Sequence, residues 1–147
     1  MTIDIDLLVP AEKRSQWLDL MRDLGFQFAH GTTTFAQFAP PQNAEEPVPV
    51  DLMFVDMQTW NSLHNDAKQE SLAGHQVYIP RAEHLIALKL HAAVSPTRSS
   101  PHQDWDDIRY IIKICRLNPS DAYFHEIILR YGGEEALSRI RKIWDET

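Results

Sequence analysis

Three aspartates have the residue type and spacing best suited to chemistry in this chain. Asp4 and Asp6 lie on a predicted strand over residues 2–9, and Asp51 lies on a second predicted strand over residues 48–55. Alternate residues of a strand point to the same face, which places Asp4 and Asp6 about 6–7 Å apart at the backbone. If the second strand pairs beside the first, Asp51 adds a third carboxylate to the same patch.

Three carboxylates on one patch suit a hard divalent cation, above all Mg2+. Two such ions about 3.5–4 Å apart can hold the attacking and leaving oxygens of an in-line phosphoryl displacement. The alternative is that these acidic residues only protect a solvated strand edge. Apolar residues alternate with the aspartates, which favours core strands, and a carboxylate cluster there needs a cation or hydrogen-bond donors nearby. These apolar residues are Ile3, Ile5, Leu7, Val9, Val50, Leu52 and Phe54.

Length and composition predict one soluble domain over residues 1–147. The net charge of −7 argues against a protein that coats nucleic acid, yet it is compatible with nucleotide handling through a bound metal. Cys115 is the single cysteine and cannot form an intramolecular disulfide, which fits a reducing compartment. No apolar run approaches the ~20 residues of a membrane span, and no secretory signal is visible, so we expect a cytoplasmic protein with no membrane partner.

The elements that would position the aspartates fill a sheet-containing part, residues 2–80, and a helical part, residues 81–147, follows it. This order predicts an α+β domain with a small mixed sheet and helices packed on it. The sheet-containing part is expected to hold a strand at 2–9, a helix at 12–24, a hairpin of 26–30 with 33–38, a proline-rich acidic loop at 40–47, a strand ending near Asp56, a helix at 57–68 capped by Asp56, and a strand at 74–79.

Four helices are expected in the second part. They cover residues 81–94, 102–117, 119–130 and 134–145. Asn118 and Pro119 would supply the cap and the first-position proline of the third helix. Gly132 and Gly133 would end it.

Lys89 is the second candidate functional residue, on a predicted helix that is apolar nearly all round. A desolvated ammonium needs a carboxylate or phosphate partner. Alternatively, Lys89 packs its stem and keeps its charge in water. Asp104 or Asp107 could pair with it and hold the helical half against the sheet, although carboxylates at a helix start are also stabilised on their own by about 0.3–1 kcal/mol.

The seven histidines do not predict zinc binding. His84 and His91 are two helical turns apart, with no Cys-x-x-Cys or His-Glu-x-x-His beside them. Cys115 belongs to an apolar stripe and is expected to pack rather than to act as a nucleophile. That stripe also contains Trp105, Ile108, Ile111 and Ile112.

These motifs together resemble the nucleotidyltransferase superfamily. Residues 4–9 and 50–55 are similar to its second and third acidic signatures, and residues 79–92 to the segment that follows them in the minimal bacterial branch. That branch includes toxin-like members of type IV toxin–antitoxin pairs. Residues 103–108 resemble its Lys-Asp-x-x-Asp helix start, with glutamine where lysine is usual. The resemblance covers most of residues 2–117.

The resemblance implies a role for each candidate residue. Asp4 and Asp6 would hold Mg2+, and Asp51 would complete the metal site and help to deprotonate an acceptor hydroxyl. Lys89 would lie near the phosphates or brace the fold. The implied reaction transfers a nucleoside monophosphate from a nucleoside triphosphate, with pyrophosphate leaving, to an unknown acceptor that is an RNA, a protein or a small molecule.

One family feature is missing from the residues before Asp4. In the family, a helix ending in a Gly-Gly/Ser turn precedes the Asp-x-Asp strand and grips the triphosphate, and positioning supplies much of the catalysis of phosphoryl transfer. Two functions therefore stay open: a nucleotidyltransferase with impaired activity, and a non-catalytic relative that senses nucleotides or binds a partner. A protein partner or a homodimer that supplies the missing helix is a further expectation.

Overall fold

The computed structural model describes residues 4–93 and 101–146 and divides into two compact units, Met1–Asn65 and Asp66–Thr147. The boundary falls before the second hairpin, whereas the sequence predicts the change from sheet to helices at residue 80. Each unit has its own hydrophobic core.

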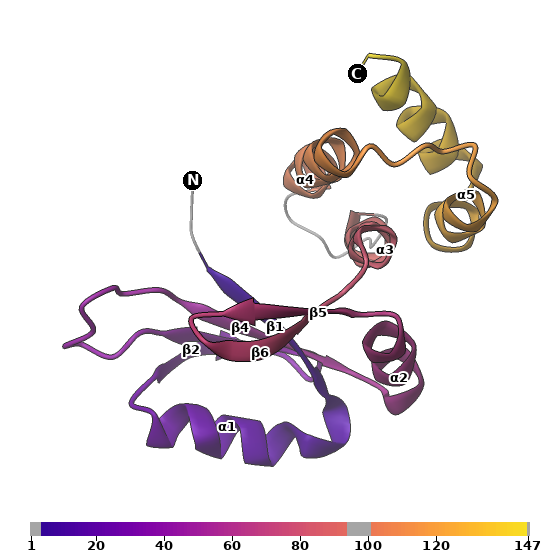
Figure 1. The fold of residues 1–147 in the computed structure, drawn as a ribbon. Coiled ribbons are helices and arrows are strands. Elements are labelled where there is room, and N and C mark those ends of the chain that lie inside the picture. The colour runs from indigo at the N-terminus through magenta and orange to yellow at the C-terminus, as the bar shows by residue number, and fades with distance from the viewer. Residues whose placement is uncertain (1–3, 94–100, 147) are drawn as a thin grey trace. The chain divides into compact units, whose positions relative to one another are not determined.

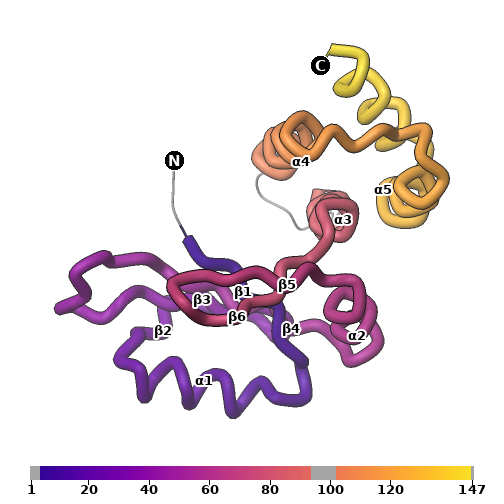
Figure 2. Tube along the Cα trace, viewed as in Figure 1, coloured from indigo at the N-terminus to yellow at the C-terminus, as the bar shows by residue number. Residues whose placement is uncertain are grey.

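The first unit is a four-stranded mixed sheet with two helices (Figure 1). Its strand order is β1-β4-β3-β2, in which β1 runs parallel to β4 and the other two pairs are antiparallel. Figure 2 traces β1 and β4 next to each other although they are far apart along the chain. In chain order the elements are β1 (Ile5–Pro10), a 3-10 turn (Ala11–Lys13), α1 (Arg14–Asp23), β2 (Gln27–Gly31), β3 (Phe35–Ala39), β4 (Val50–Val55) and α2 (Met57–Asn65).

One face of this sheet is the core of the first unit, and α1 covers it (Figure 1). Met21 of α1 is 3% exposed, and Trp17 and Leu18 pack against the same cluster. The strand residues of the core alternate along each strand, as a strand period of two requires. They are Val9, Ala36, Phe38, Val50, Leu52 and Phe54. The residues between them therefore face away from α1.

The predicted cap of α2 is confirmed. The Thr59 backbone N–H donates to Asp56 Oδ1 over 2.8 Å, and the Thr59 hydroxyl donates to Asp56 Oδ2 over 3.2 Å. The end of this helix was predicted wrongly, because α2 stops at Asn65 rather than at residue 68.

The chain after α2 forms a hairpin that the sequence analysis did not predict as a pair. β5 (Lys68–Leu72) is antiparallel to β6 (His75–Ile79), and β6 confirms the predicted strand at 74–79. Ala73 and Gly74 connect them with φ angles of 49° and 81°. Two successive positive φ angles give the backbone twist that a tight hairpin requires.

The rest of the second unit consists of three helices, α3 (Ala82–Ala93), α4 (Pro101–Cys115) and α5 (Ala122–Asp145). They enclose a core of ten buried residues. These are Ile86, Leu90, Ile108, Ile112, Phe124, Ile128, Ala136, Leu137, Ile140 and Ile143. Among the described residues, none of the helices is both long and apolar enough to cross a membrane.

The predicted start of the helix that follows α4 was wrong. α5 is capped by Asp121, whose carboxylate accepts from the N–H groups of Tyr123 and Phe124, so Asn118 and Pro119 lie in the preceding turn. Asn118 instead accepts from the Ser120 N–H within that turn. The predicted break at the glycine pair is confirmed, because Gly133 has φ 70° and ψ −171° inside α5.

Cys115 was predicted to pack in the apolar stripe of its helix, but it is exposed. The stripe is buried at Ile108 and Ile112, and Trp105 and Ile111 pack against the same core. Cys115 is the last residue of α4, and its neighbour Ile114 is 60% exposed. The stripe therefore ends one turn before the cysteine.

Candidate metal site on the four-stranded sheet

Three carboxylates meet on the first unit's sheet. Asp4, Asp6 and Asp51 each offer one oxygen, and these three atoms lie within 4.8 Å of one another. Asp6 on β1 and Asp51 on β4 are Cα partners in the parallel pair, and the Ile5 N–H donates to the Pro49 carbonyl oxygen over 3.0 Å beside Asp4. The structure thus brings together the three aspartates that the sequence singles out.

The alternation of each strand explains why these side chains share one face. Leu7 and Leu52, the next residues along β1 and β4, belong to the core on the α1 side. Asp6 and Asp51 therefore face away from α1, because successive strand residues point to opposite faces. Asp4 and Asp6 are exposed, and Asp51 is half-buried.

The surroundings of Asp51 perturb its carboxyl group. Burial raises the pKa of its carboxyl group, and the nearby charge of Asp4 raises it further. A hydrogen bond from the Gln37 side chain and the charge of His30 act in the opposite direction, and the pKa still lies above its usual value. Asp51 in its ionised form therefore needs a positive partner nearby.

An unsatisfied atom marks the same residue. Asp51 Oδ1 is buried and has no hydrogen-bond partner in the described parts of the chain. Buried polar atoms are nearly always paired, so an orphaned carboxylate oxygen in an acidic cluster is a place where a ligand fits. The donor set consists only of carboxylate oxygens, which are the ligands that Mg2+ prefers. The residues present therefore fit a magnesium site.

Within residues 4–93 and 101–146, no other group of three histidine, cysteine or acidic side chains converges in this way. His84 is buried, but its Nε2 lies 2.7 Å from the Tyr123 hydroxyl and 3.8 Å from Asp66 Oδ2, and His91 is exposed. The two histidines on α3 therefore do not face a shared ligand set.

Lys89 belongs to the second unit, where two carboxylates of α4 hold its ammonium group. Its Nζ donates to Asp107 Oδ2 over 2.6 Å and lies 4.0 Å from Oδ1 of Asp104, which is 1% exposed. The partners are those that the sequence analysis named. The ion pairs join α3 to α4 within the helical unit.

Gln37 was not predicted as a site residue, although it lies beside Asp51 on β3. Gln37 is the Cα partner of Asp51 in the antiparallel β3–β4 pair. The available signal was a lone amide in a strand of aromatic and small apolar residues, Phe35 to Ala39. That signal points to the triad only when the register between the two strands is known.

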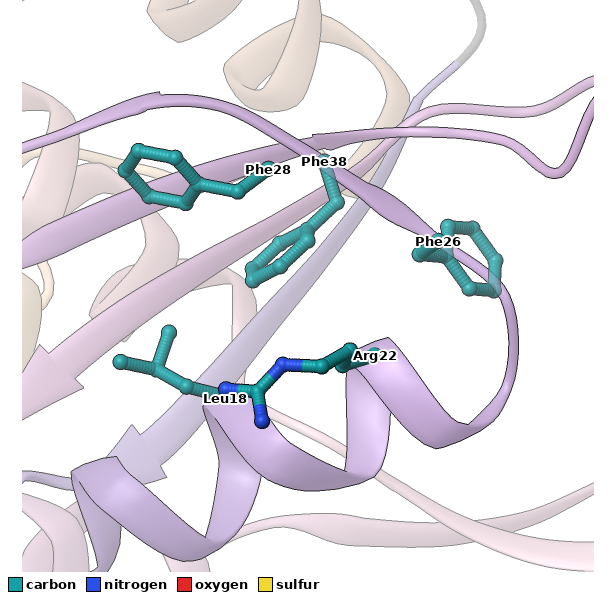
Figure 3. A pocket seen from close by; sticks show the side chains of 5 residues that line it. All are labelled: Leu18, Arg22, Phe26, Phe28 and Phe38. Carbon is teal, nitrogen blue, oxygen red and sulfur yellow. The ribbon is translucent and has the colours of Figure 1, made fainter.

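A cavity of about 220 Å³ lies on the other side of the same sheet (Figure 3). It opens between α1 and the β2–β3 edge, and Arg22 is its charged lining residue. Arg22 is paired with Asp19 over 3.0 Å. The remaining lining residues are Leu18, Phe26, Phe28 and Phe38. This cavity therefore offers apolar surface and no set of catalytic groups.

Comparison with known proteins identifies the fold. No family model matches the sequence, and no curated protein matches it. The chain is similar to the crystal structure of an antigenic nucleotidyltransferase-like protein from Paracoccidioides brasiliensis, with a TM-score of 0.50 and 16% sequence identity. The match covers 95% of this chain and 69% of that one. The chain therefore has a nucleotidyltransferase-like α+β fold with a small mixed sheet, as the sequence predicts.

Proposed function

We propose that this protein is a Mg2+-dependent nucleotidyltransferase, which transfers a nucleoside monophosphate from a nucleoside triphosphate to an acceptor hydroxyl. The observation that carries the proposal is the convergence of Asp4, Asp6 and Asp51 within 4.8 Å on a nucleotidyltransferase-like fold. The orphaned Oδ1 of Asp51 supports it, because this atom lacks the partner that a cation would supply.

The two exposed carboxylates, Asp4 and Asp6, would bind the metal from the open side of the sheet, and Asp51 would complete the ligand set. Bound Mg2+ supplies the positive charge that offsets the triphosphate and the three carboxylates. In the reaction a bond forms between the acceptor oxygen and the α-phosphorus, and the bond from that phosphorus to the pyrophosphate oxygen breaks.

Asp51 is the residue we assign to the acceptor proton. Burial raises the pKa of its carboxyl group in the metal-free protein, which makes it a better proton acceptor than an ordinary aspartate. Asp51 would thus both bind the cation and help to deprotonate the hydroxyl.

Lys89 has a bracing role in this proposal rather than a phosphate-binding one. Its ammonium group is engaged by Asp107 and lies near the buried Asp104. A buried carboxylate needs such a counter-charge, which explains a lysine on an otherwise apolar helix.

Calorimetry and a transfer assay test the proposal. Wild type, Asp6→Asn and the control Asp23→Asn are titrated with Mg2+ and ATP, and each is then incubated with α-labelled nucleoside triphosphates. Asp23 is an exposed carboxylate on α1 and undergoes the same change of charge. We expect metal-dependent binding and pyrophosphate release that Asp6→Asn loses and Asp23→Asn keeps. Binding without transfer would instead favour a nucleotide sensor, and no metal binding in wild type would refute the site.

The toxin-like relationship and the cytoplasmic location belong to the same proposal. The single cysteine fits a reducing compartment, where nucleoside triphosphates are available. Expression of wild type is then expected to slow the growth of a bacterial host, whereas Asp6→Asn at the same protein level is not. Equal growth with both variants would contradict the toxin-like role.

A further inference from the structure

A row of polar residues crosses the whole sheet through the acidic triad. Asp6 on β1 is the Cα partner of Asp51 on β4. Asp51 is in turn the partner of Gln37 on β3, and Gln37 is the partner of His30 on β2. Directly opposed residues of neighbouring strands present their side chains to the same face. Gln37 therefore stands beside Asp51 on the face that carries the three carboxylates, although its strand contributes no acidic residue.

The surroundings of Gln37 give its side chain little choice of partner. Its sequence neighbours Ala36 and Phe38 are 0% and 2% exposed in the core, and Phe35 and Ala39 are half-buried on its own face. A half-buried amide in an apolar strand is costly unless it is hydrogen-bonded. The polar group beside it is its cross-strand partner Asp51, and the Gln37 side chain acts to lower the pKa of that carboxyl group.

The direction of the hydrogen bond between Gln37 and Asp51 follows from the groups involved. An ionised carboxylate only accepts, so the Gln37 amide N–H is the donor. Asp51 Oδ1 has no hydrogen-bond partner in the described structure.

We propose that Gln37 is a positioning residue for the metal site: its amide fixes the Asp51 carboxylate so that Oδ1 is directed to the cation that Asp4 and Asp6 also bind. This inference rests on the proposed function, because it assumes the metal site. Partners that orient a metal ligand set its direction, and their loss commonly weakens metal binding by about 10–100-fold.

The test measures Mn2+ binding to the full chain by calorimetry and by the electron paramagnetic resonance spectrum of the bound ion. Gln37→Met keeps the size of the side chain and removes its donor. Gln27→Met is the matched control, because Gln27 is an exposed glutamine on β2 outside the polar row. We expect Gln37→Met to weaken Mn2+ binding about 10–100-fold and to change the spectrum of the residual bound ion. We expect Gln27→Met to change neither.

Gln37→Glu distinguishes positioning from simple charge and serves as the second variant if Gln37→Met does not fold. An added carboxylate would tighten cation binding if only the local negative charge mattered. A glutamate cannot donate to Asp51 and repels it, so positioning predicts weaker binding. Mn2+ affinity of both variants equal to or above that of wild type would overturn the role of Gln37.

Asp6→Asn separates this inference from the proposed function. If Asp6→Asn abolishes Mn2+ binding while both Gln37 variants bind like wild type, the metal site stands and the positioning role fails. If wild type itself does not bind Mn2+, the proposed function fails first and the inference with it.

Discussion

Asp6 and Asp51 are direct partners across the parallel strands β1 and β4, so two acidic side chains from distant parts of the sequence lie side by side. Asp4 completes the group, and one oxygen of each lies within 4.8 Å of the others. Without a cation this arrangement is repulsive, because like charges at such distances disfavour ionisation. The same arrangement becomes favourable once a divalent ion neutralises it.

Removal of the Asp51 charge is expected to stabilise the metal-free protein. The pKa of Asp51 is raised in the folded state, so the folded state binds protons more readily than the unfolded one. Protonated Asp51 therefore stabilises the folded state at a pH below the pKa that Asp51 has in the unfolded chain. This stabilisation is lost as the pH rises through the pKa of Asp51 in the folded state. At pH 7 in chelator, Asp51→Asn should therefore melt about 2 °C or more above wild type by differential scanning fluorimetry.

The Asp23→Asn control should melt close to wild type under the same conditions, because Asp23 is exposed on α1. A lower melting temperature for Asp51→Asn in chelator would contradict the repulsive cluster.

Mg2+ should reverse that order of stability. A ligand that binds only the folded state stabilises it by about 2.7 kcal/mol at 100 times its Kd. Wild type should therefore gain melting temperature as Mg2+ is added, while Asp6→Asn and Asp51→Asn should gain little. The same ionic strength supplied as NaCl is the control, since salt also screens carboxylate repulsion. An equal gain with NaCl would show screening rather than a metal site.

The Asp56 cap should make the first unit sensitive to acid. The Thr59 backbone N–H is the main cause that holds the pKa of Asp56 below its usual value. A depressed pKa gives stability that is present above the unfolded pKa and is lost as the pH falls through the folded pKa. Asp56→Ala should therefore lower the melting temperature at pH 7, and its difference from wild type should vanish in acid.

Asp56→Asn keeps an acceptor for the Thr59 N–H without the charge. It should remain close to wild type at pH 7 and show a smaller pH dependence. An Asp56→Ala difference that persists below the folded pKa would assign the effect to packing rather than to the carboxylate.

The Lys89 ion pairs should contribute unequally to the second unit. Lys89→Met leaves Asp104, which is 1% exposed, without this counter-charge, and we expect a loss of about 1–3 kcal/mol in the free energy of unfolding. Asp107→Asn removes a carboxylate whose side chain is 42% exposed, so about 0–1 kcal/mol is expected. Urea denaturation of both variants measures the difference. If Asp107→Asn lost more free energy of unfolding than Lys89→Met, the exposed pair with Asp107 would be the more important one.

Strand alternation was enough to predict which residues of the candidate site share one face of the sheet. Asp4, Asp6 and Asp51 each alternate with apolar residues, and the core positions Val9, Leu52 and Phe54 confirm which face is buried. The register between the strands was not predictable, because any even shift keeps the same residues on the same face. Gln37 was missed for this reason: its place beside Asp51 is a property of the β3–β4 register.

Elements with weak periodic patterns were harder to predict. Residues 68–72 read Lys-Gln-Glu-Ser-Leu and show no apolar alternation, so no strand was predicted there and the preceding helix was extended to Lys68. Their strand comes from pairing with β6 across the turn at Ala73 and Gly74. The start of α5 was misplaced because Asn118 and Asp121 are both good cap residues, and the choice between them depends on the turn that joins α4 to α5.

The parallel pairing of β1 with β4 also has a consequence for biosynthesis. A parallel neighbour cannot be reached by a tight turn, so β1 emerges from the ribosome long before β4 does. Closing this long loop is a slow, non-local step, and only its completion gathers the three carboxylates. A nascent chain that ends before β4 would therefore have no preformed cation site, and metal binding would report that the sheet has closed.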